Sequence, residues 1–549
     1  MDSPDDKNVL NEILNHLKNL DSRISKIENR INVQSIHEDE EVSVPEPEEI
    51  IPQKSDDELE FQIGQFWAAK AGILVLLVGF AFLLLLPHSE FPALVPFLFG
   101  IVLSLILFGL ARFWKDSFAH ISGYLVGAGF ILSFLTIMRL YFFGFSKAIE
   151  SLPVEITLLI IVTALSLIVG VRRNSSFIAG LGITFGYVTA VLTDYSYIIF
   201  IMILALSFVT VYFKLKYEWN IFLFYGIFLS YLTHFVWFIN NPFMGHTLQS
   251  VAKPEINLLF ILLYVIIFST TNLLDKNGKE EDFLKTGLTM LNCGGGYGLI
   301  LLITLLTTPT TLAIYNLIAS IVFLSIAITY WIKEKSKYIT FFYAMFGYAA
   351  LSVAINIQFE SPDSFVWLCW QSLLVVSTAV WFRSKYIIVA NFVIFLMIFA
   401  AFLISSGVTS GISLSFGIVA LLSARILNWK KDELELKTEQ MRNAYLLSAL
   451  FIIPYSFYQM LPSGYVSLSW IGVAIIYYIL SIILKNKKYR WMALATYFLT
   501  VLYVFILGIT SAGIAYKIIS FIVLGATLII VSIVYSRKKG KDKSATKEA

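Results

Sequence analysis

The chain has 549 residues, of which 58% are hydrophobic and only 14% are charged. A soluble domain carries about 25% charged residues, so an ordinary soluble protein is excluded as the main body of the chain. The net charge of +3 is uninformative as a total, because the charges gather near the two ends and in short clusters between long apolar runs. That distribution is typical of a multi-pass membrane protein.

Residues 1–33 are predicted to form a cytoplasmic coiled-coil helix. The stretch "LNEILNHLKNLDSRISKIENRI" spaces its apolar residues alternately by three and four, as a coiled coil requires. We expect homo-oligomers that form through residues 8–31; the alternative is an amphipathic helix lying on the protein's own cytoplasmic face. The repeated positions are Leu10, Ile13, Leu17, Leu20, Ile24, Ile27 and Ile31.

Residues 34–60 are acidic and interrupted by proline. Such a segment cannot bury a core, so we expect a disordered linker. Residues 61–537 are then predicted to form an all-α, polytopic membrane domain, and residues 538–549 a basic cytoplasmic tail. Two cysteines, Cys293 and Cys369, both lie in apolar runs, which excludes a disulfide scaffold and a cysteine-based zinc site.

About eighteen transmembrane helices, or about nine hairpins, are predicted. The criterion is a run of about 20 apolar residues, because each helical residue advances 1.5 Å through a hydrocarbon layer of about 30 Å. The predicted spans are 67–86, 92–112, 118–141, 152–171, 175–193, 196–213, 218–239, 255–274, 285–307, 309–332, 337–358, 364–382, 385–405, 409–428, 440–460, 464–484, 489–508 and 512–536.

The loops between these spans alternate in charge. Every second loop is basic, as in "RFWKD", "VRRNS" and "KNKKYR", and the intervening loops carry no Lys or Arg except Lys147 and Lys253. Because Lys and Arg remain on the cytoplasmic side, we expect both termini to be cytoplasmic. The hairpins also resemble one another, which indicates either duplication of a hairpin or the limited composition of apolar helices.

Three consecutive glycines, Gly294, Gly295 and Gly296, lie in "MLNCGGGYGLILLI". A phosphate loop is rejected, since no strand precedes them and no Gly-Lys-Ser/Thr follows. Two interpretations remain. In a continuous helix the glycines would allow close helix packing; in a broken helix the freed backbone groups would line a substrate cavity.

Polar side chains within or beside the spans are further substrate-path candidates. Arg139 is expected to extend to the outer lipid headgroups, and Asp194 to be solvated in an outer loop. The alternative is that these two residues form an outward-facing ion pair. His234 is expected to be a hydrogen-bonded structural residue, with a proton relay or a ligand contact as the alternative. Gln371 is expected to bond a neighbouring helix. The same is expected of Asn292, Asn316, Asn356 and Asn391.

No catalytic, cofactor-binding or metal-binding residues are predicted. Gly-x-Ser-x-Gly and His-Glu-x-x-His motifs do not occur, and the outer loops are too short for an active site outside the membrane. A nucleic-acid partner is not expected, because topology accounts for the basic clusters. Membrane lipids are the expected partners.

Four passages resemble the family of predicted multi-pass bacterial membrane proteins known as domain of unknown function 2339. They are "IGQFWAAKAGILVLLVGFAFLL", "FAHISGYLVGAGFILSFLTIMRLY" followed by "SFIAGLGITFGYVTAVL", "FVWLCWQSLLVVSTAVWFRSKY" and "YKIISFIVLGATLIIVSIVYSRKK". The likeness covers roughly residues 60 to 537, with Gln371 at a position that the family often fills with Glu. It implies the bacterial cytoplasmic (inner) membrane and no particular activity. The first span ends without the lysine that often follows it in the family.

Three functions are therefore considered. The first is transport or cell-envelope maintenance, in which the protein moves or binds a small or lipid-like substrate. The second is an integral membrane enzyme for a lipid-linked substrate, which would gather Glu90, Asp194, His234 and His246 in one outward cavity. The third is a membrane scaffold that recruits partners through the N-terminal coiled coil.

Overall fold

The computed structural model describes residues 94–506, apart from gaps at 117–118, 144–146, 252, 275–282, 308–311, 406–411 and 430–437, together with residues 72–75, 77–80, 522 and 525. The chain divides into two compact units, Met1–Ala71 and Gly72–Ala549. All described residues belong to the second unit. The predicted coiled coil (1–33), linker (34–60) and tail (538–549) lie outside them, as do most of the predicted spans 67–86 and 512–536.

Every regular element in the described part of the chain is helical. A short 3-10 helix, η2 (Pro242–Met244), accompanies sixteen α-helices. In chain order the α-helices are α4 (Leu94–Phe113), α5 (Ala119–Met138), α6 (Leu152–Arg172), α7 (Ser176–Thr193), α8 (Ser196–Tyr217), α9 (Asn220–Phe238), α10 (Asn257–Leu274), α11 (Phe283–Thr307), α12 (Leu312–Lys333), α13 (Lys337–Gln358), α14 (Asp363–Trp381), α15 (Lys385–Ser405), α16 (Ile412–Trp429), α17 (Thr438–Met460), α18 (Ser463–Ile483) and α19 (Lys487–Ile506).

Each of these sixteen helices coincides with a predicted span. Thirteen are long and apolar enough to cross a membrane. α16 is apolar but shorter, and α17 and α19 begin with polar turns that contain Arg442 and Lys487–Arg490. The all-helical prediction is confirmed for the described residues, whereas the count of eighteen spans is not.

Local sequence explains several helix boundaries. Ser175 and Ser336 precede α7 and α13, and each side chain accepts a hydrogen bond of 3.4 Å from the backbone N–H three residues on. Pro153 occupies the first turn of α6, where its missing N–H costs nothing. Asp194 and Glu218 end α7 and α8 in the left-handed conformation that stops a helix.

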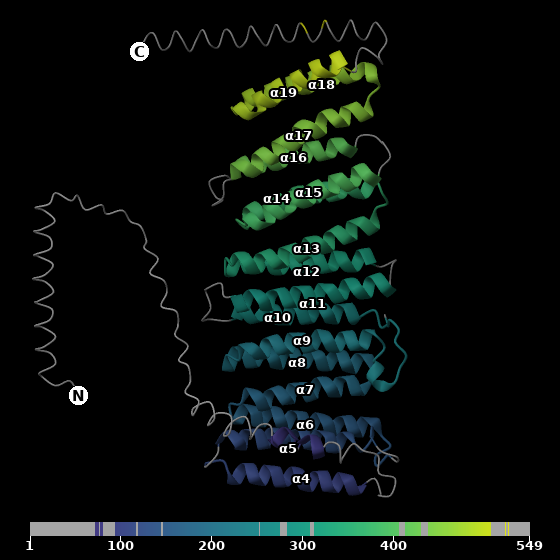
Figure 1. Cartoon of the computed structure of the whole chain (residues 1–549), viewed down its shortest axis with the longest axis vertical. Coiled ribbons are helices and arrows are strands. Elements are labelled where there is room, and N and C mark those ends of the chain that lie inside the picture. Colours follow the sequence, from purple (N-terminus) through teal and green to yellow (C-terminus); the bar gives the residue numbers. More distant parts are fainter. Residues whose placement is uncertain are drawn as a thin grey trace, which may run out of the picture. The chain divides into compact units, whose positions relative to one another are not determined.

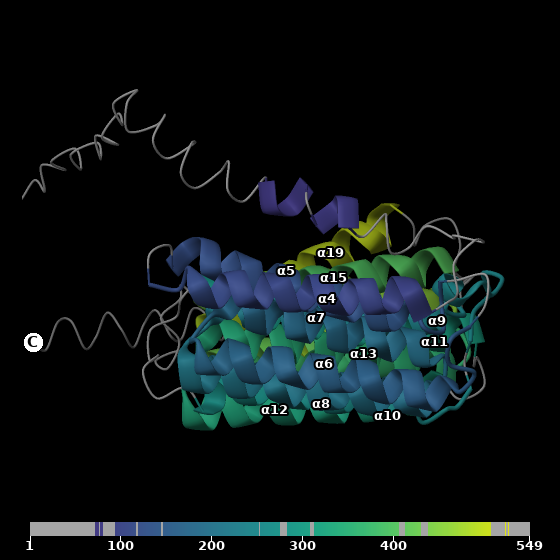
Figure 2. The same ribbon diagram turned by 90° about the horizontal axis from the view of Figure 1, so that it is seen from below.

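The helices form an array in which contacts follow the chain order. All extensive contacts between described helices join a helix to one that is one or two places away in sequence. Figure 1 shows the helix pairs following one another from α4 to α19, and Figure 2 shows their long axes lying side by side. This nearest-neighbour arrangement is that of a repeat array rather than of a closed bundle.

Two large apolar cores run through the array. One belongs to α4–α7 and includes Leu107, Phe134 and Leu159. The other extends from α7 to α19 and includes Phe200, Phe323 and Phe416. α7 contributes to both, so α4–α7 form a subdivision of the array with a core of its own.

Buried hydroxyl and amide groups join alternate helices across the array. Tyr264 of α10 donates to a backbone carbonyl of α8 at 3.1 Å, and Tyr330 of α12 donates to a carbonyl of α10. Tyr231 of α9 donates to Asn292 of α11 at 2.6 Å, and Asn292 donates to Tyr343 of α13 at 3.0 Å. In an apolar surrounding such bonds are few but stabilise helix association.

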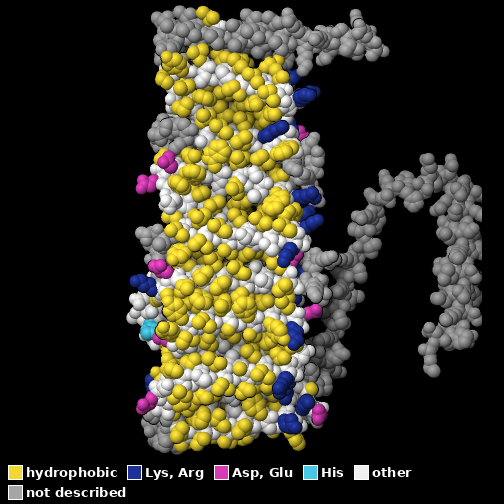
Figure 3. All heavy atoms as spheres, turned by 180° about the vertical axis from the view of Figure 1, so that it is seen from behind, with side chains coloured by type: hydrophobic (Ala, Val, Ile, Leu, Met, Phe, Trp, Pro, Cys, Tyr) yellow, Lys and Arg dark blue, Asp and Glu magenta, His cyan; other side chains and the backbone are white. Residues whose placement is uncertain are grey.

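The helix ends gather at two edges of different charge. Of the described Lys and Arg residues, only Arg139, Lys147 and Lys253 lie at one edge, and all others lie at or near the helix ends of the other, which we call the basic edge. Figure 3 shows the Lys and Arg side chains mainly along one edge of a broad apolar surface. This arrangement agrees with the alternation of basic loops in the sequence.

Candidate functional site

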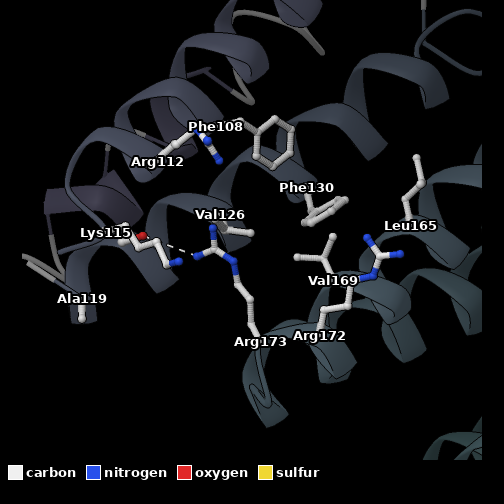
Figure 4. A pocket seen from close by; sticks show the side chains of 11 residues that line it. Phe108, Arg112, Lys115, Ala119, Val126, Phe130, Leu165, Val169, Arg172 and Arg173 are labelled. Atoms are coloured by element: carbon white, nitrogen blue, oxygen red, sulfur yellow. Dashed lines mark hydrogen bonds between the residues drawn. The ribbon is translucent and has the colours of Figure 1, made fainter.

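A cavity of about 740 Å³ opens between α4, α5 and α6 at the basic edge. Four cations surround it: Arg112 and Lys115 from the end of α4, and Arg172 and Arg173 from the end of α6. In Figure 4 the side chains of Lys115 and Arg173 extend toward one another from opposite sides. We call this cavity the α4–α6 pocket. Its remaining lining residues are Phe108, Ala119, Ser122, Val126, Phe130, Leu165 and Val169.

Ser122, in the first turn of α5, joins the three helix ends. Its hydroxyl donates to the carbonyl oxygen of Ala111 in α4 at 2.6 Å and accepts from Nη1 of Arg173 at 3.4 Å. Ser122 itself is buried. The guanidinium of Arg173 is therefore oriented across the end of α5, which fixes one side of the mouth.

Aromatic residues form the deeper wall. The rings of Phe108 and Phe130 meet edge to face, with centroids 5.1 Å apart. Phe108 also lies over Gly129, where a Cβ atom would come within 2.8 Å of its ring. The small residue lets α4 and α5 approach closely, and this approach brings the two rings together.

No carboxylate among the described residues neutralises the positive charge of the pocket. Within the described ranges, no carboxylate, including that of Asp116 in the same turn, lies within 4.0 Å of the four cations. Cations elsewhere on the basic edge do have such partners, since Glu439 pairs with Arg442 at 3.3 Å and with Lys488 at 2.7 Å. Like charges gathered without a counter-charge repel one another, so a bound anion would stabilise the site.

This arrangement is suited to an anionic amphiphile. Guanidinium groups bind phosphate and carboxylate through paired, charge-assisted hydrogen bonds. The apolar wall behind them would hold a hydrocarbon chain, and basic pockets between membrane helices bind lipid headgroups in this way. The pocket contains no carboxylate, His or Cys, and no group of three such residues that could hold a metal occurs anywhere in the described sequence.

A second cavity, of about 820 Å³, lies at the basic edge between α7 and α9. Its walls include Phe177, Trp219 and Phe222, and the hydroxyl groups of Thr184 and Tyr225 share a hydrogen bond of 2.6 Å there. None of its lining residues is Lys or Arg. It therefore lacks the charge that marks the α4–α6 pocket as an anion site.

The three glycines lie in a continuous helix, so the broken-helix interpretation is wrong. α11 runs without interruption from Phe283 to Thr307. A Cβ on Gly295 would come within 2.6 Å of the Tyr231 ring, and one on Gly296 would collide with Val265. Gly294 has ordinary space, with its nearest neighbour at 3.7 Å. Close packing against α9 and α10 explains the second and third glycines.

Gln371 bonds a neighbouring helix, as expected. Its Nε2 donates to the carbonyl oxygen of Tyr348 and to the hydroxyl of Ser352 in α13, each at 2.9 Å. Asn292 and Asn316 both donate and accept hydrogen bonds in the core, and Asn391 donates to Ser372 and Tyr445. Asn356 differs, because it is exposed near the end of α13. The side chains of Gln371 and of these three buried asparagines therefore make hydrogen bonds within the protein that stabilise the fold.

Asp194 pairs with residues of the connection after α9 rather than with Arg139. Its carboxylate accepts from Nδ2 of Asn241 at 2.8 Å and lies 2.6 Å from Nε2 of His246. Arg139, directly after α5, is only 6% exposed and is therefore enclosed by protein. The expectation that it extends to the surface is wrong.

His234 is fully buried, but the predicted hydrogen bond is absent. Neither ring nitrogen has a partner in the structure as described. The ring stacks on Phe200, with centroids 5.0 Å apart, and meets Trp237 and Tyr264 edge to face. Its environment is aromatic packing, and the hydrogen bonds that a proton relay needs are missing.

The seven predicted residues do not form one site. Gly295 and Gly296 pack against α9 and α10. The ring of His234, on α9, lies among aromatic rings of α8, α9 and α10. Arg139, Asp194 and Gln371 lie elsewhere, directly after α5, directly after α7 and in α14. None lines the α4–α6 pocket. In the sequence the four pocket cations indicate only topology. Their one further signal is that "RFWKD" and "VRRNS" are consecutive basic loops. Glu90 lies outside the described residues.

Comparisons with protein-family models, with curated proteins and with solved structures found no match to this chain.

Proposed function

We propose that this protein binds an anionic, lipid-like substrate in the α4–α6 pocket as part of transport or cell-envelope maintenance. The observation that carries the proposal is a set of four cations around an apolar-walled cavity at the basic edge, which have no carboxylate partner in the part of the chain that the structure describes. A phosphate headgroup would lie between Arg112, Lys115 and Arg173. An acyl or isoprenoid chain would follow the wall formed by Phe108 and Phe130.

The thirteen apolar helices support a multi-pass membrane protein. The proposal extends this to about eighteen spans in the bacterial cytoplasmic membrane, with both termini and the basic edge on the cytoplasmic side. The headgroup would then come from the inner leaflet. Membership in the domain of unknown function 2339 family, and homo-oligomers formed through the coiled coil of residues 8–31, belong to the same proposal.

The test is lipid binding by the purified full-length protein. Nanodiscs would contain a trace of fluorescent phosphatidylglycerol or, in parallel, of the zwitterionic phosphatidylcholine. In the pocket variant, Arg112, Lys115, Arg172 and Arg173 are each replaced by Gln. Each basic residue near a headgroup contributes about 1 kcal/mol, so we expect at least a tenfold weaker binding of phosphatidylglycerol in this variant.

A matched control removes the same charge from the same edge. It carries Gln in place of Lys333, Lys335, Lys485 and Lys487, all of which are exposed. This control should bind phosphatidylglycerol as the wild type does. Equal losses in both variants would mean that only general surface charge matters, and equal binding of the two lipids by the wild type would refute the proposal. Movement of the same lipid between leaflets of reconstituted vesicles then separates a transporter from a binding protein.

A further inference from the structure

Glu155 is a carboxyl group buried in the first turn of α6 without a partner. Its exposed fraction is 0%, and neither carboxyl oxygen has a hydrogen-bond partner. It lies at the end of α6 opposite Arg172, about 25 Å away along the helix at 1.5 Å per residue. It is therefore separate from the α4–α6 pocket and is not used by the proposed function.

The neighbouring helix α7 carries a second polar group that is buried without a hydrogen-bond partner. α6 and α7 are antiparallel, with Leu167 against Gly182 and Gly170 against Ala179. This register places the first turns of α6 beside the last turns of α7. There the hydroxyl of Thr189 is also fully buried without a partner.

The charged groups around Glu155 do not satisfy it. α6 packs against α5 and α7. Beyond α5 lies Arg139, and Glu155 accepts no hydrogen bond from it. Beyond α7 lies Asp194, which is bonded to Asn241 and His246. In the connection before α6, Lys147 lies 3.7 Å above the Tyr141 ring, and Glu150 is exposed.

An ionised carboxylate in this position would be unpaired and cut off from water. Such a charge is costly in an apolar interior, and a group that has no partner instead takes up a proton. The protonated carboxyl group is uncharged, so its burial without a hydrogen-bond partner costs much less than burial of the carboxylate. The buried state in the structure therefore corresponds to the protonated form of Glu155.

Opening of the first turn of α6 would bring Glu155 to water. Glu155 lies within the first turn of α6, and Ser151 before it makes no side-chain capping bond. An uncapped first turn opens more readily than the helix interior. When it opens, the positive end of the helix dipole favours the ionised carboxylate. Burial and the dipole thus favour opposite protonation states.

We propose that Glu155 is a proton-binding site at the edge opposite the basic edge. A hydronium ion from that side transfers its proton to the carboxylate, giving a carboxylic acid and water, and the reverse step returns the proton. Lipid binding in the α4–α6 pocket is not required for this exchange, so the two proposals are tested separately.

Infrared difference spectroscopy of the full-length protein in nanodiscs, over a pH series, tests the site. The wild type should show the carbonyl band of a protonated carboxylic acid in apolar surroundings, and this band should decline as the pH rises. Glu155→Gln should abolish it. Glu150→Gln removes an exposed carboxyl five residues away and should leave the band unchanged. A band of unchanged size in Glu155→Gln, or no such band in the wild type, would overturn the proposal.

A second measurement needs no variant. Dicyclohexylcarbodiimide, an apolar reagent, modifies protonated carboxyl groups in apolar surroundings. Peptide mapping of the treated wild-type protein should find the adduct on Glu155, in a yield that falls as the pH rises, with little on Glu150. An unmodified Glu155, or a yield on Glu155 that does not depend on pH, would rule out a site that exchanges protons with the medium.

Discussion

The hydroxyl of Tyr231 donates a hydrogen bond of 2.6 Å to Oδ1 of Asn292. Three residues further along α11, Gly295 leaves the space that the ring of the same tyrosine fills. α11 therefore holds both the polar end and the apolar body of Tyr231. Tyrosine suits this position because it combines a large apolar ring with a hydrogen-bonding group. This contact joins α9 to α11 in the centre of the array.

Asn292→Ala should lower the free energy of unfolding by about 2 kcal/mol. The substitution removes three buried hydrogen bonds, to Tyr231, Tyr343 and the Val265 carbonyl, each worth about 0.6 kcal/mol in a membrane protein. Unfolding of the detergent-solubilised protein with increasing SDS measures the change. Asn356→Ala, at an exposed position near the end of α13, is the control and should be neutral. Equal effects of the two substitutions would contradict the account.

Gly295→Ala and Gly294→Ala form a matched pair in adjacent positions. The first places a Cβ within 2.6 Å of a tyrosine ring that its hydroxyl bond holds in place, and should cost about 1–3 kcal/mol. The second adds a methyl group 3.7 Å from its nearest neighbour, so it should be neutral or stabilise the helix by up to about 1 kcal/mol. The same unfolding assay compares them. The opposite order would mean that α11 does not pack as described.

His234→Phe should leave stability unchanged or increase it. The substitution replaces two buried nitrogens that have no partner with ring carbons and retains the stacking on Phe200. Burial of an unsatisfied polar group costs about 1–3 kcal/mol, so removing it offsets the strain of the slightly larger ring. A loss of more than about 2 kcal/mol would indicate that the imidazole makes a stabilising bond. Asn292→Ala, at a bonded buried position, provides the contrast.

Phosphatidylglycerol binding should weaken as ionic strength rises. The four pocket cations act through charge, and salt screens partly exposed charges over about 10 Å at 0.1 M. Between about 0.05 and 0.5 M NaCl we expect a several-fold loss of affinity in the wild type. The variant with four Gln substitutions should show a much flatter dependence. A flat salt profile in the wild type would indicate that the apolar wall, and not the cations, holds the lipid.

The helices were largely predictable because length and hydropathy determine them. A run such as Leu152–Arg172 has one stable form in lipid, since its backbone groups must bond within the segment. The alternation of basic loops likewise predicted which helix ends would lie together. α17 and α19 show the limit of this reasoning, because their polar first turns reduce the apolar length available to cross a membrane.

The candidate site was not predictable to the same degree. Arg112 and Arg173 are 61 residues apart in sequence, and only the packing of α4 and α6 against α5 brings them around one cavity. A basic loop gives the same signal in the sequence whether its cations are free or paired. Glu155 follows Pro153 at a helix start, where an acidic residue is usually solvated, so the sequence alone does not distinguish it from an exposed carboxylate. Its burial is a property of the packed α6–α7 pair.

The most direct test of the central claim is the accessibility of single cysteines in intact bacterial cells. Native Cys293 and Cys369 are buried, so they provide a silent background. Asn174→Cys and Lys335→Cys probe the basic edge, and Thr247→Cys and Ser361→Cys probe the opposite edge; all four positions are exposed. A membrane-impermeant maleimide should label the second pair in intact cells and the first pair only after the membrane is opened. Labelling of Asn174→Cys and Lys335→Cys in intact cells would contradict the proposed membrane topology and the inner-leaflet lipid site with it.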